Sequence, residues 1–176
     1  MPNFDAIHIS RITTRAIVHL KSWIPARAAS LPRPPAVPAN CRLLTLAPGE
    51  WLLISDTLDE TALHEHAVQV HEHGIAAAGP STGLAALQLE GPAARDVLAK
   101  SCGLDLHPSS FPIGTCTRTR LAQLPVIIDF LEASPRFELY VGRSYRSYLE
   151  SWLTDAAVGF QTTSPSPPRS ADPASP

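Results

Sequence analysis

The chain has little of what marks cofactor loops and disulfide frameworks. Its 176 residues include nine glycines, three cysteines and one methionine. The glycines stand apart from one another, so neither GxGxxG nor GxxxxGK[ST], the loops that cradle phosphate groups, occurs in the sequence. We therefore expect this chain to bind no FAD or NAD by itself, and we predict no catalytic and no cofactor-binding residue.

The cysteines and the hydrophobic runs exclude two further classes. Cys41, Cys102 and Cys116 are odd in number and form no CxxC pair, which is typical of reduced thiols in a cytosolic chain. No window approaches the roughly 20 apolar residues that a membrane helix needs, and charges or histidines interrupt residues 1–20. We expect a cytoplasmic protein that contacts no membrane.

The chain also lacks an excess of positive charge. Its formal net charge is −2, and lysine and arginine are scattered rather than gathered into stripes. Binding to a nucleic-acid backbone depends on such a basic surface. We therefore expect no nucleic acid among the partners.

Proline is the one residue type in clear excess. The sequence has 18 prolines, whereas average usage of about 5% predicts about nine. Ten of them lie within residues 25–38 and 165–176. The second stretch has almost no apolar side chain to bury, so we predict one domain over residues 1–160 and a disordered Pro/Ser-rich tail over 161–176. The first stretch is predicted to be a long surface loop.

Hydrophobic periodicity predicts an α+β domain with a mostly antiparallel sheet and three helices. Strands are predicted over residues 13–20, 42–46, 51–55, 84–89, 115–121, 125–131 and 137–141. Helices are predicted over residues 57–73, 91–100 and from 144 onward. Thr57 with Glu60 is expected to cap the first helix, and Ser144 the last. The last helix carries its apolar residues at helical spacing: Tyr145, Tyr148, Leu149, Trp152, Leu153 and Ala156.

Histidines cluster in the first predicted helix, at positions 64, 66, 71 and 73. A helix brings metal ligands together at i, i+3 or i+4, and two residues seven positions apart are about 10.5 Å apart along the axis. This spacing favours a solvated helix flank and predicts no metal site, with an incidental or intermolecular site as the alternative. A small thiol enzyme or metalloprotein built on Cys102, Cys116 and these histidines is a rival hypothesis. Cys102 and His107 would be its nucleophile and base, but no third orienting group is evident.

Three segments carry a resemblance to a known family. They read GPAARDVLAK at residues 91–100, GLDLHP at 103–108 and FPIGTC at 111–116. Flanking segments at 46–55 and 137–145 agree in order and spacing. Together they resemble the sarcosine oxidase gamma subunit family, with coverage from about residue 12 to residue 158.

The resemblance implies a fold related to the folate-binding region of aminomethyltransferases. It also implies a gamma subunit that is structural or accessory within a heterotetrameric sarcosine oxidase. Such a complex oxidatively demethylates sarcosine to glycine, with formation of hydrogen peroxide and methylene-tetrahydrofolate. FAD, FMN, NAD, tetrahydrofolate and zinc are then expected in the alpha, beta and delta partner subunits, and the isolated chain is expected to have no activity. The alternative is a stand-alone folate-binding or interaction module without oxidase activity.

A subunit of this kind would contribute by burying surface against its partners. Interface cores favour Trp, Tyr and Arg, so the candidate interface residues are Trp51, Arg143, Tyr145 and Trp152. Tyr145 and Trp152 also follow the apolar stripe of the last helix, which favours internal packing for these two.

Overall fold

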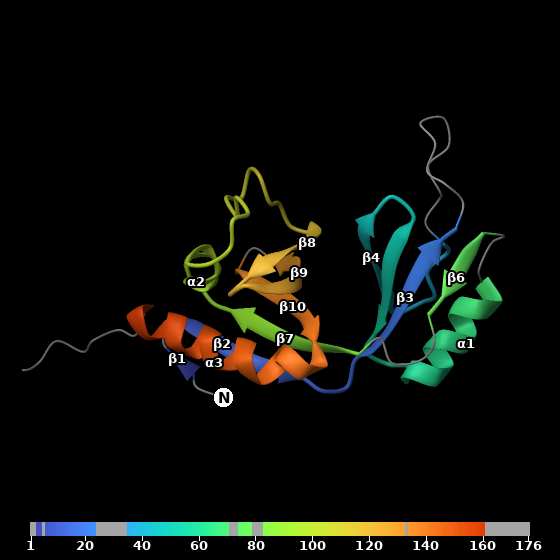
Figure 1. The fold of residues 1–176 in the computed structure, drawn as a ribbon, viewed down its shortest axis with the longest axis horizontal. Coiled ribbons are helices and arrows are strands. Elements are labelled where there is room, and N and C mark those ends of the chain that lie inside the picture. Colours follow the sequence, from blue (N-terminus) through green and yellow to red (C-terminus); the bar gives the residue numbers. More distant parts are fainter. Residues whose placement is uncertain are drawn as a thin grey trace, which may run out of the picture.

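The computed structural model describes residues 3–4, 6–23, 35–70, 74–78, 83–132 and 134–160. These residues form two antiparallel sheets, three α-helices and two 3-10 turns (Figure 1). The predicted α+β class with a mostly antiparallel sheet and three helices is confirmed. The predicted tail, residues 161–176, lies outside the described residues.

Six strands form the larger sheet, and every neighbouring pair is antiparallel. Their spatial order is β1 (Asn3–Phe4), β2 (Ile7–Ile12), β7 (Leu84–Glu90), β10 (Arg136–Gly142), β9 (Leu124–Glu132) and β8 (Cys116–Leu121).

Four strands form the smaller sheet, again with antiparallel neighbours. Their order is β4 (Cys41–Ala47), β5 (Glu50–Ser55), β3 (Ala16–Ser22) and β6 (Ile75–Ala77). The helices are α1 (Glu60–Val70), α2 (Ala94–Ala99) and α3 (Arg146–Ala157), and the 3-10 turns are η1 (Arg143–Tyr145) and η2 (Val158–Phe160).

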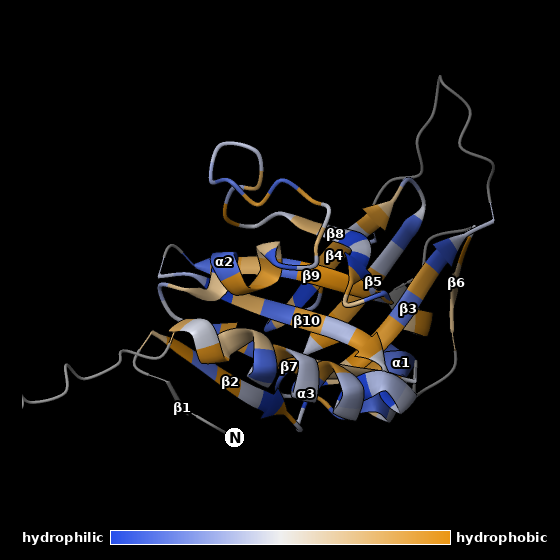
Figure 2. Cartoon of the chain, turned by 60° about the vertical axis from the view of Figure 1, so that its left-hand side comes forward, coloured by the Kyte–Doolittle hydropathy of each residue, from blue (hydrophilic) through white to orange (hydrophobic). Residues whose placement is uncertain are grey.

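Alternation along the strands stacks these elements into four layers. On β10, Phe137 and Leu139 belong to a core that the six-stranded sheet forms with α2 and α3, whereas Tyr140 belongs to a core shared by the two sheets. On β5, Leu52 joins that shared core and Leu53 packs in the core beneath α1. The order is therefore α2 and α3, the larger sheet, the smaller sheet and α1, and Figure 2 shows the matching bands of hydropathy along the strands.

The predicted strand at residues 13–20 corresponds to β3 but begins three residues too early. β2 ends at Ile12 and β3 begins at Ala16, and the two strands belong to different sheets. The chain therefore leaves one sheet and enters the other at residues 13–15, where no glycine or proline marks a break. Strands β1, β2 and β6 were not predicted, whereas β4, β5, β7, β8, β9 and β10 lie where the pattern places them.

Both predicted helix caps are wrong. Asp59 Oδ1, and not Thr57, accepts the backbone N–H of Ala62 at 2.8 Å, because α1 begins at Glu60. Thr57 instead donates its amide to Ser55 Oγ in the preceding turn. Ser144 lies inside η1, so the N-cap of α3 is Tyr145, one residue later than predicted, and it makes no side-chain cap.

A buried ion cluster joins the two sheets. Arg15, just before β3, and Arg42 of β4 both pair with Glu138 of β10. Arg42 also lies 2.8 Å from Asp129 Oδ2 on β9, and the Tyr140 hydroxyl donates to Glu138 Oε2 at 2.6 Å. Asp129 and Glu138 are almost fully buried, so two arginines balance two carboxylates within the interior.

Burial sets the pKa values in this cluster. Removal from water raises the pKa of Asp129, and Arg42 opposes that rise. Burial and the neighbouring Glu138 raise the pKa of Tyr140, so its hydroxyl stays protonated and remains a donor to that carboxylate.

Replacing Glu138 with Gln should destabilise the fold strongly. The change removes the buried negative charge that Arg15 and Arg42 share, and breaking a buried pair typically costs about 3–5 kcal/mol. Urea denaturation at pH 7 measures this as a lower transition midpoint at unchanged slope. The matched control is Glu132→Gln, which removes an exposed pair with Arg136 and should cost at most about 1 kcal/mol. Equal losses in the two variants would contradict the role of the cluster.

Candidate functional site

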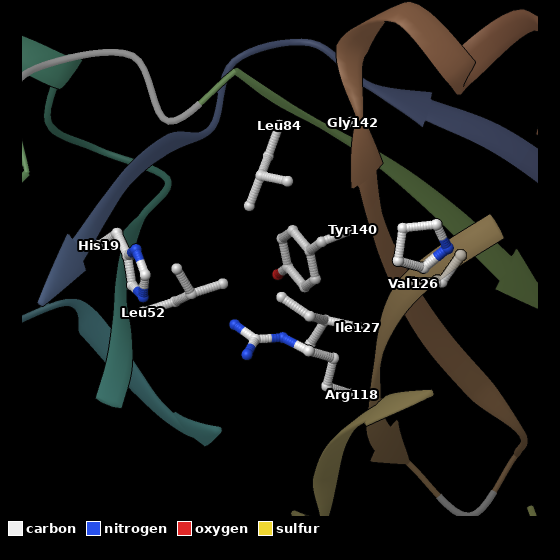
Figure 3. A pocket seen from close by; sticks show the side chains of 9 residues that line it. His19, Leu52, Leu84, Arg118, Val126, Ile127, Tyr140 and Gly142 are labelled. Carbon is white, nitrogen blue, oxygen red and sulfur yellow. The ribbon is translucent and has the colours of Figure 1, made fainter. Parts of the chain in front are cut away.

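A pocket of about 300 Å³ opens between the two sheets, and we call it the inter-sheet pocket. Figure 3 shows Leu52 and His19 entering it from the smaller sheet and Tyr140, Ile127 and Arg118 from the larger one. Leu84, Pro125, Val126 and Gly142 complete its lining. The volume lies at the lower end of the roughly 300–1,000 Å³ typical of small-molecule sites.

The polar side chains of the inter-sheet pocket are committed to one another. Glu50 Oε1 lies 2.8 Å from His19 Nε2 and accepts a hydrogen bond from Arg118 Nη2 at 2.8 Å. The hydrogen bond from Arg118 has the largest effect in lowering the pKa of Glu50, and the contact with His19 lowers it further. The Tyr140 hydroxyl is held by Glu138. Because these groups already have partners, the pocket offers a mainly apolar surface and no acid–base pair that is free to act on a substrate.

A second, smaller pocket of about 240 Å³ lies where the β2–β3 connection meets the start of β7 and η1. We call it the arginine pocket, because four arginines line it: Arg11, Arg15, Arg143 and Arg146. The sequence analysis did not predict it. These residues are far apart in the chain, and no spacing rule connects them.

The nucleophile–base pair of the rival thiol-enzyme hypothesis, Cys102 with His107, does not form. Cys102 is buried, and its Sγ lies 3.8 Å from Thr119 Oγ1. His107 Nδ1 lies 2.7 Å from Ser109 Oγ instead. Burial, followed by the charge of Asp129, raises the pKa of Cys116 to about 11, and its thiol donates to the Thr45 carbonyl. A thiol with such a pKa is almost wholly protonated at pH 7 and is a poor nucleophile.

The histidine cluster is described only in part. His64 and His66 are half-buried on α1, whereas His71 and His73 lie outside the described residues. Within the described ranges, no three His, Cys, Asp or Glu side chains come together to hold a metal ion. No helix in those ranges has the length and hydropathy to span a membrane.

In the segments that carry the family resemblance, several residues hold the backbone in place through packing and hydrogen bonds. The Arg95 guanidinium stacks 4.3 Å from the centroid of the Phe130 ring and donates to the carbonyl of Leu106. Phe111 is buried, and its amide donates to His107 O at 2.8 Å. Gly91 has φ +121°, and a Cβ there would lie 2.6 Å from the Ala6 carbonyl oxygen. These residues therefore have roles in packing and backbone geometry.

The candidate interface residues fall in different environments. Trp51 is 2% exposed and packs in the core beneath α1, so it presents no surface. Trp152 is partly buried against the core of the larger sheet. Tyr145 is 49% exposed, Tyr148 is 53% exposed, and Arg143 is exposed as well. Both tyrosines lie outside the core that their spacing suggested, because Leu149, Leu153, Ala156 and Ala157 form the buried face of α3.

Replacing Glu50 with Gln should reduce stability at pH 7 by about 1 kcal/mol, since it removes a partly exposed ion pair. The folded-state pKa of Glu50 is lowered, so its contribution is present above the unfolded pKa of about 4.3 and is lost as pH falls through the folded value. Urea denaturation between pH 7 and pH 3 should show the wild type and the variant converging below about pH 4. Glu65→Gln on the exposed face of α1 is the control, and a gap that stays constant with pH would contradict the assignment.

Cys102 and Cys116 should resist alkylation in the folded chain. At pH 7.5 a thiol of pKa about 11 has a thiolate fraction roughly a hundredfold or more below that of an ordinary cysteine. Peptide mapping after brief exposure to iodoacetamide should find both cysteines protected, with the protection lost in urea. Rapid labelling of either one in the native state would revive the thiol-enzyme hypothesis.

Comparison with known proteins gives consistent matches. The family model described as "Sarcosine oxidase, gamma subunit family" matches residues 35–159. The sarcosine oxidase subunit gamma of Corynebacterium sp. (strain U-96) is 34% identical over 67% of this chain and 57% of the relative. The counterpart from Corynebacterium sp. (strain P-1) is 33% identical with the same coverage. The chain thus spans somewhat more than half the length of these curated relatives.

Two solved structures share the fold. A chain of the heterotetrameric sarcosine oxidase from Corynebacterium sp. U-96, in complex with pyrrole 2-carboxylate, has a TM-score of 0.74 at 24% identity. That match covers 90% of this chain and 87% of the other. The glycine cleavage system aminomethyltransferase T from Bartonella henselae has a TM-score of 0.62 at 14% identity, covering 84% of this chain and 45% of the other. The expected aminomethyltransferase-like fold is thereby confirmed, and the family match over residues 35–159 makes this chain a member of the sarcosine oxidase gamma subunit family.

Proposed function

We propose that this chain is the gamma subunit of a heterotetrameric sarcosine oxidase. The complex would oxidatively demethylate sarcosine to glycine, with formation of hydrogen peroxide and methylene-tetrahydrofolate. Membership of the gamma subunit family carries the proposal, and the names of the curated relatives support it.

Within that complex, the chain acts as a structural subunit and performs no chemistry alone. The pairing of its polar side chains with one another supports this role. His19, Arg118 and Glu50 pair with one another at the inter-sheet pocket, and the Cys116 thiol is protonated. Catalytic groups need perturbed pKa values together with access to a substrate, and the described part of the chain does not combine the two at one place.

The cofactors then belong to the other subunits. FAD, FMN, NAD and tetrahydrofolate would sit on the larger alpha and beta chains, and zinc on the delta chain. The separated glycines of this sequence support that division, because a pyrophosphate needs a close backbone approach that side chains obstruct. The assembled enzyme would be cytoplasmic.

The exposed aromatic residues of α3 and the turn before it provide a docking surface. Tyr145 and Tyr148 are three positions apart, so they lie on one flank of the helix, and Trp152 continues that flank while packing partly against the core. Large aromatic side chains that lie half in solvent are frequent anchors at protein interfaces. We assign this flank, and not Trp51, to contact with the larger subunits.

Co-expression with the larger oxidase subunits tests the proposal. We expect the chain to co-elute with flavin-containing partners on size exclusion, and the chain purified alone to be colourless and to release no hydrogen peroxide from sarcosine. The double variant Tyr145→Ala with Tyr148→Ala should weaken assembly at least tenfold, since anchor residues contribute 2 kcal/mol or more. Ile113→Ala, which truncates an exposed side chain on another loop, is the matched control.

Two outcomes would contradict the proposal. Sarcosine turnover or bound flavin in the isolated chain would assign it the chemistry itself. Saturable binding of tetrahydrofolate to the isolated chain by calorimetry, without association with larger subunits, would favour the stand-alone folate-binding module.

A further inference from the structure

The arginine pocket concentrates positive charge on a chain whose net charge is −2. Arg11, Arg15, Arg143 and Arg146 line it together with one acidic residue, Glu60. Acidic residues behind the lining neutralise part of this charge, so the partners of each arginine decide what the pocket can bind.

Two of the four arginines already form ion pairs with acidic side chains of this chain. Arg11 forms a bidentate pair with Glu150, with both N···O distances at 2.7 Å. Arg15 pairs with Asp56 at 2.7 Å and with the buried Glu138. Both guanidinium groups therefore already have a carboxylate partner at short distance within the fold.

The other two arginines retain side-chain hydrogen-bond donors that could pair with a new acceptor. Arg146 Nε lies 3.7 Å from Glu150 Oε1, too far for a hydrogen bond, and the described part of the chain offers this nitrogen no other acceptor. Among the described residues, the side chain of Arg143 has neither an acid nor a hydrogen-bond acceptor as partner, although its backbone N–H donates to the Gly83 carbonyl at 2.7 Å. That backbone bond anchors η1 against the start of β7, so Arg143 is held at the pocket by its main chain while its guanidinium is free.

We propose that the arginine pocket receives one acidic side chain of a larger oxidase subunit, whose carboxylate pairs with Arg143 and Arg146. The inference rests on the proposed function. An arginine fork binds a carboxylate through two parallel hydrogen bonds, and the Arg11–Glu150 pair already uses that geometry at this pocket.

The size of the pocket favours a carboxylate anchored on a protein over a free ligand. Its volume of about 240 Å³ is below the roughly 300–1,000 Å³ of pockets that bury small molecules, but it suffices for the end of an Asp or Glu side chain. A carboxylate on a partner also loses less freedom on binding than a free anion, because the rest of the interface has already fixed its position.

Affinity of the full chain for the assembled larger subunits tests this pairing. Arg143→Glu places a second negative charge beside Glu60 and should raise Kd at least tenfold at 50 mM salt, with a smaller effect at 500 mM. Arg120→Glu, the same charge reversal on β8, is the matched control and should change Kd less than twofold. Thermal unfolding of the isolated Arg143→Glu chain should match the wild type, since the side chain of Arg143 is exposed and pairs with none of the described residues.

A chemical cross-link identifies the occupant. Arg143→Lys supplies a primary amine at the same place, and a zero-length carbodiimide reagent joins an amine to a carboxylate in direct contact with it. We expect mass spectrometry to find an amide bond from position 143 to an Asp or Glu of a larger subunit, and none from Arg120→Lys.

The possible failures are distinguishable. If the wild-type chain does not associate with the larger subunits, the proposed function fails and this inference fails with it. If the wild type associates and Arg143→Glu binds equally well, or if Arg120→Glu is equally impaired, only this inference is overturned. If the isolated chain binds inorganic phosphate and this binding depends on Arg143, the pocket is a free-anion site. If Arg143→Glu changes the oligomeric state of the isolated chain, the occupant is a second copy of the chain.

Discussion

The carboxylate of Glu138 is the point through which the two sheets are joined. It accepts from Arg15 and Arg42, which come from the smaller sheet, and from Tyr140 on its own strand. A buried carboxylate is tolerated only when its charge and its acceptor capacity are both satisfied. This requirement constrains how β10 faces β4 and the start of β3, alongside the apolar packing between Ile17, Leu44, Ile127 and their neighbours.

That junction also limits what the interior can do chemically. The inter-sheet pocket lies beside the cluster and shares Tyr140 with it, so the hydroxyl nearest to any occupant is already bound to Glu138. At the same pocket, Glu50 holds Arg118 and His19 in the same manner. The polar side chains that line this pocket are therefore paired within the fold. The capacity for new contacts therefore lies at the surface, in Arg143 and the exposed tyrosines.

Sequence reasoning succeeded where a signal was local and failed where it was not. The β4–β5 hairpin, β7 and the strands after residue 115 follow from alternation and turn residues such as Pro48 and Gly49. The start of β3 was predicted three residues early, because residues 13–15 have ordinary strand propensity and only the tertiary structure shows that the chain passes from one sheet to the other there. The ion cluster was missed for a related reason. Arg42 and Glu138 are 96 positions apart, and strand alternation does not show which polar side chains of two sheets meet.

The same limit applies to surfaces. Helical spacing put Tyr145 and Tyr148 in line with Leu149 and Leu153, but spacing gives the angle around a helix and not the width of the face that another element covers. The residues of the family signature give the complementary lesson. Arg95, Phe111 and Gly91 are accounted for by stacking, burial and a close backbone approach, so their roles are explained by the fold itself. Residues that recognise a partner must be sought among side chains that the fold itself does not need, and Arg143 meets that condition: its backbone anchors the turn while its guanidinium is left for a neighbour.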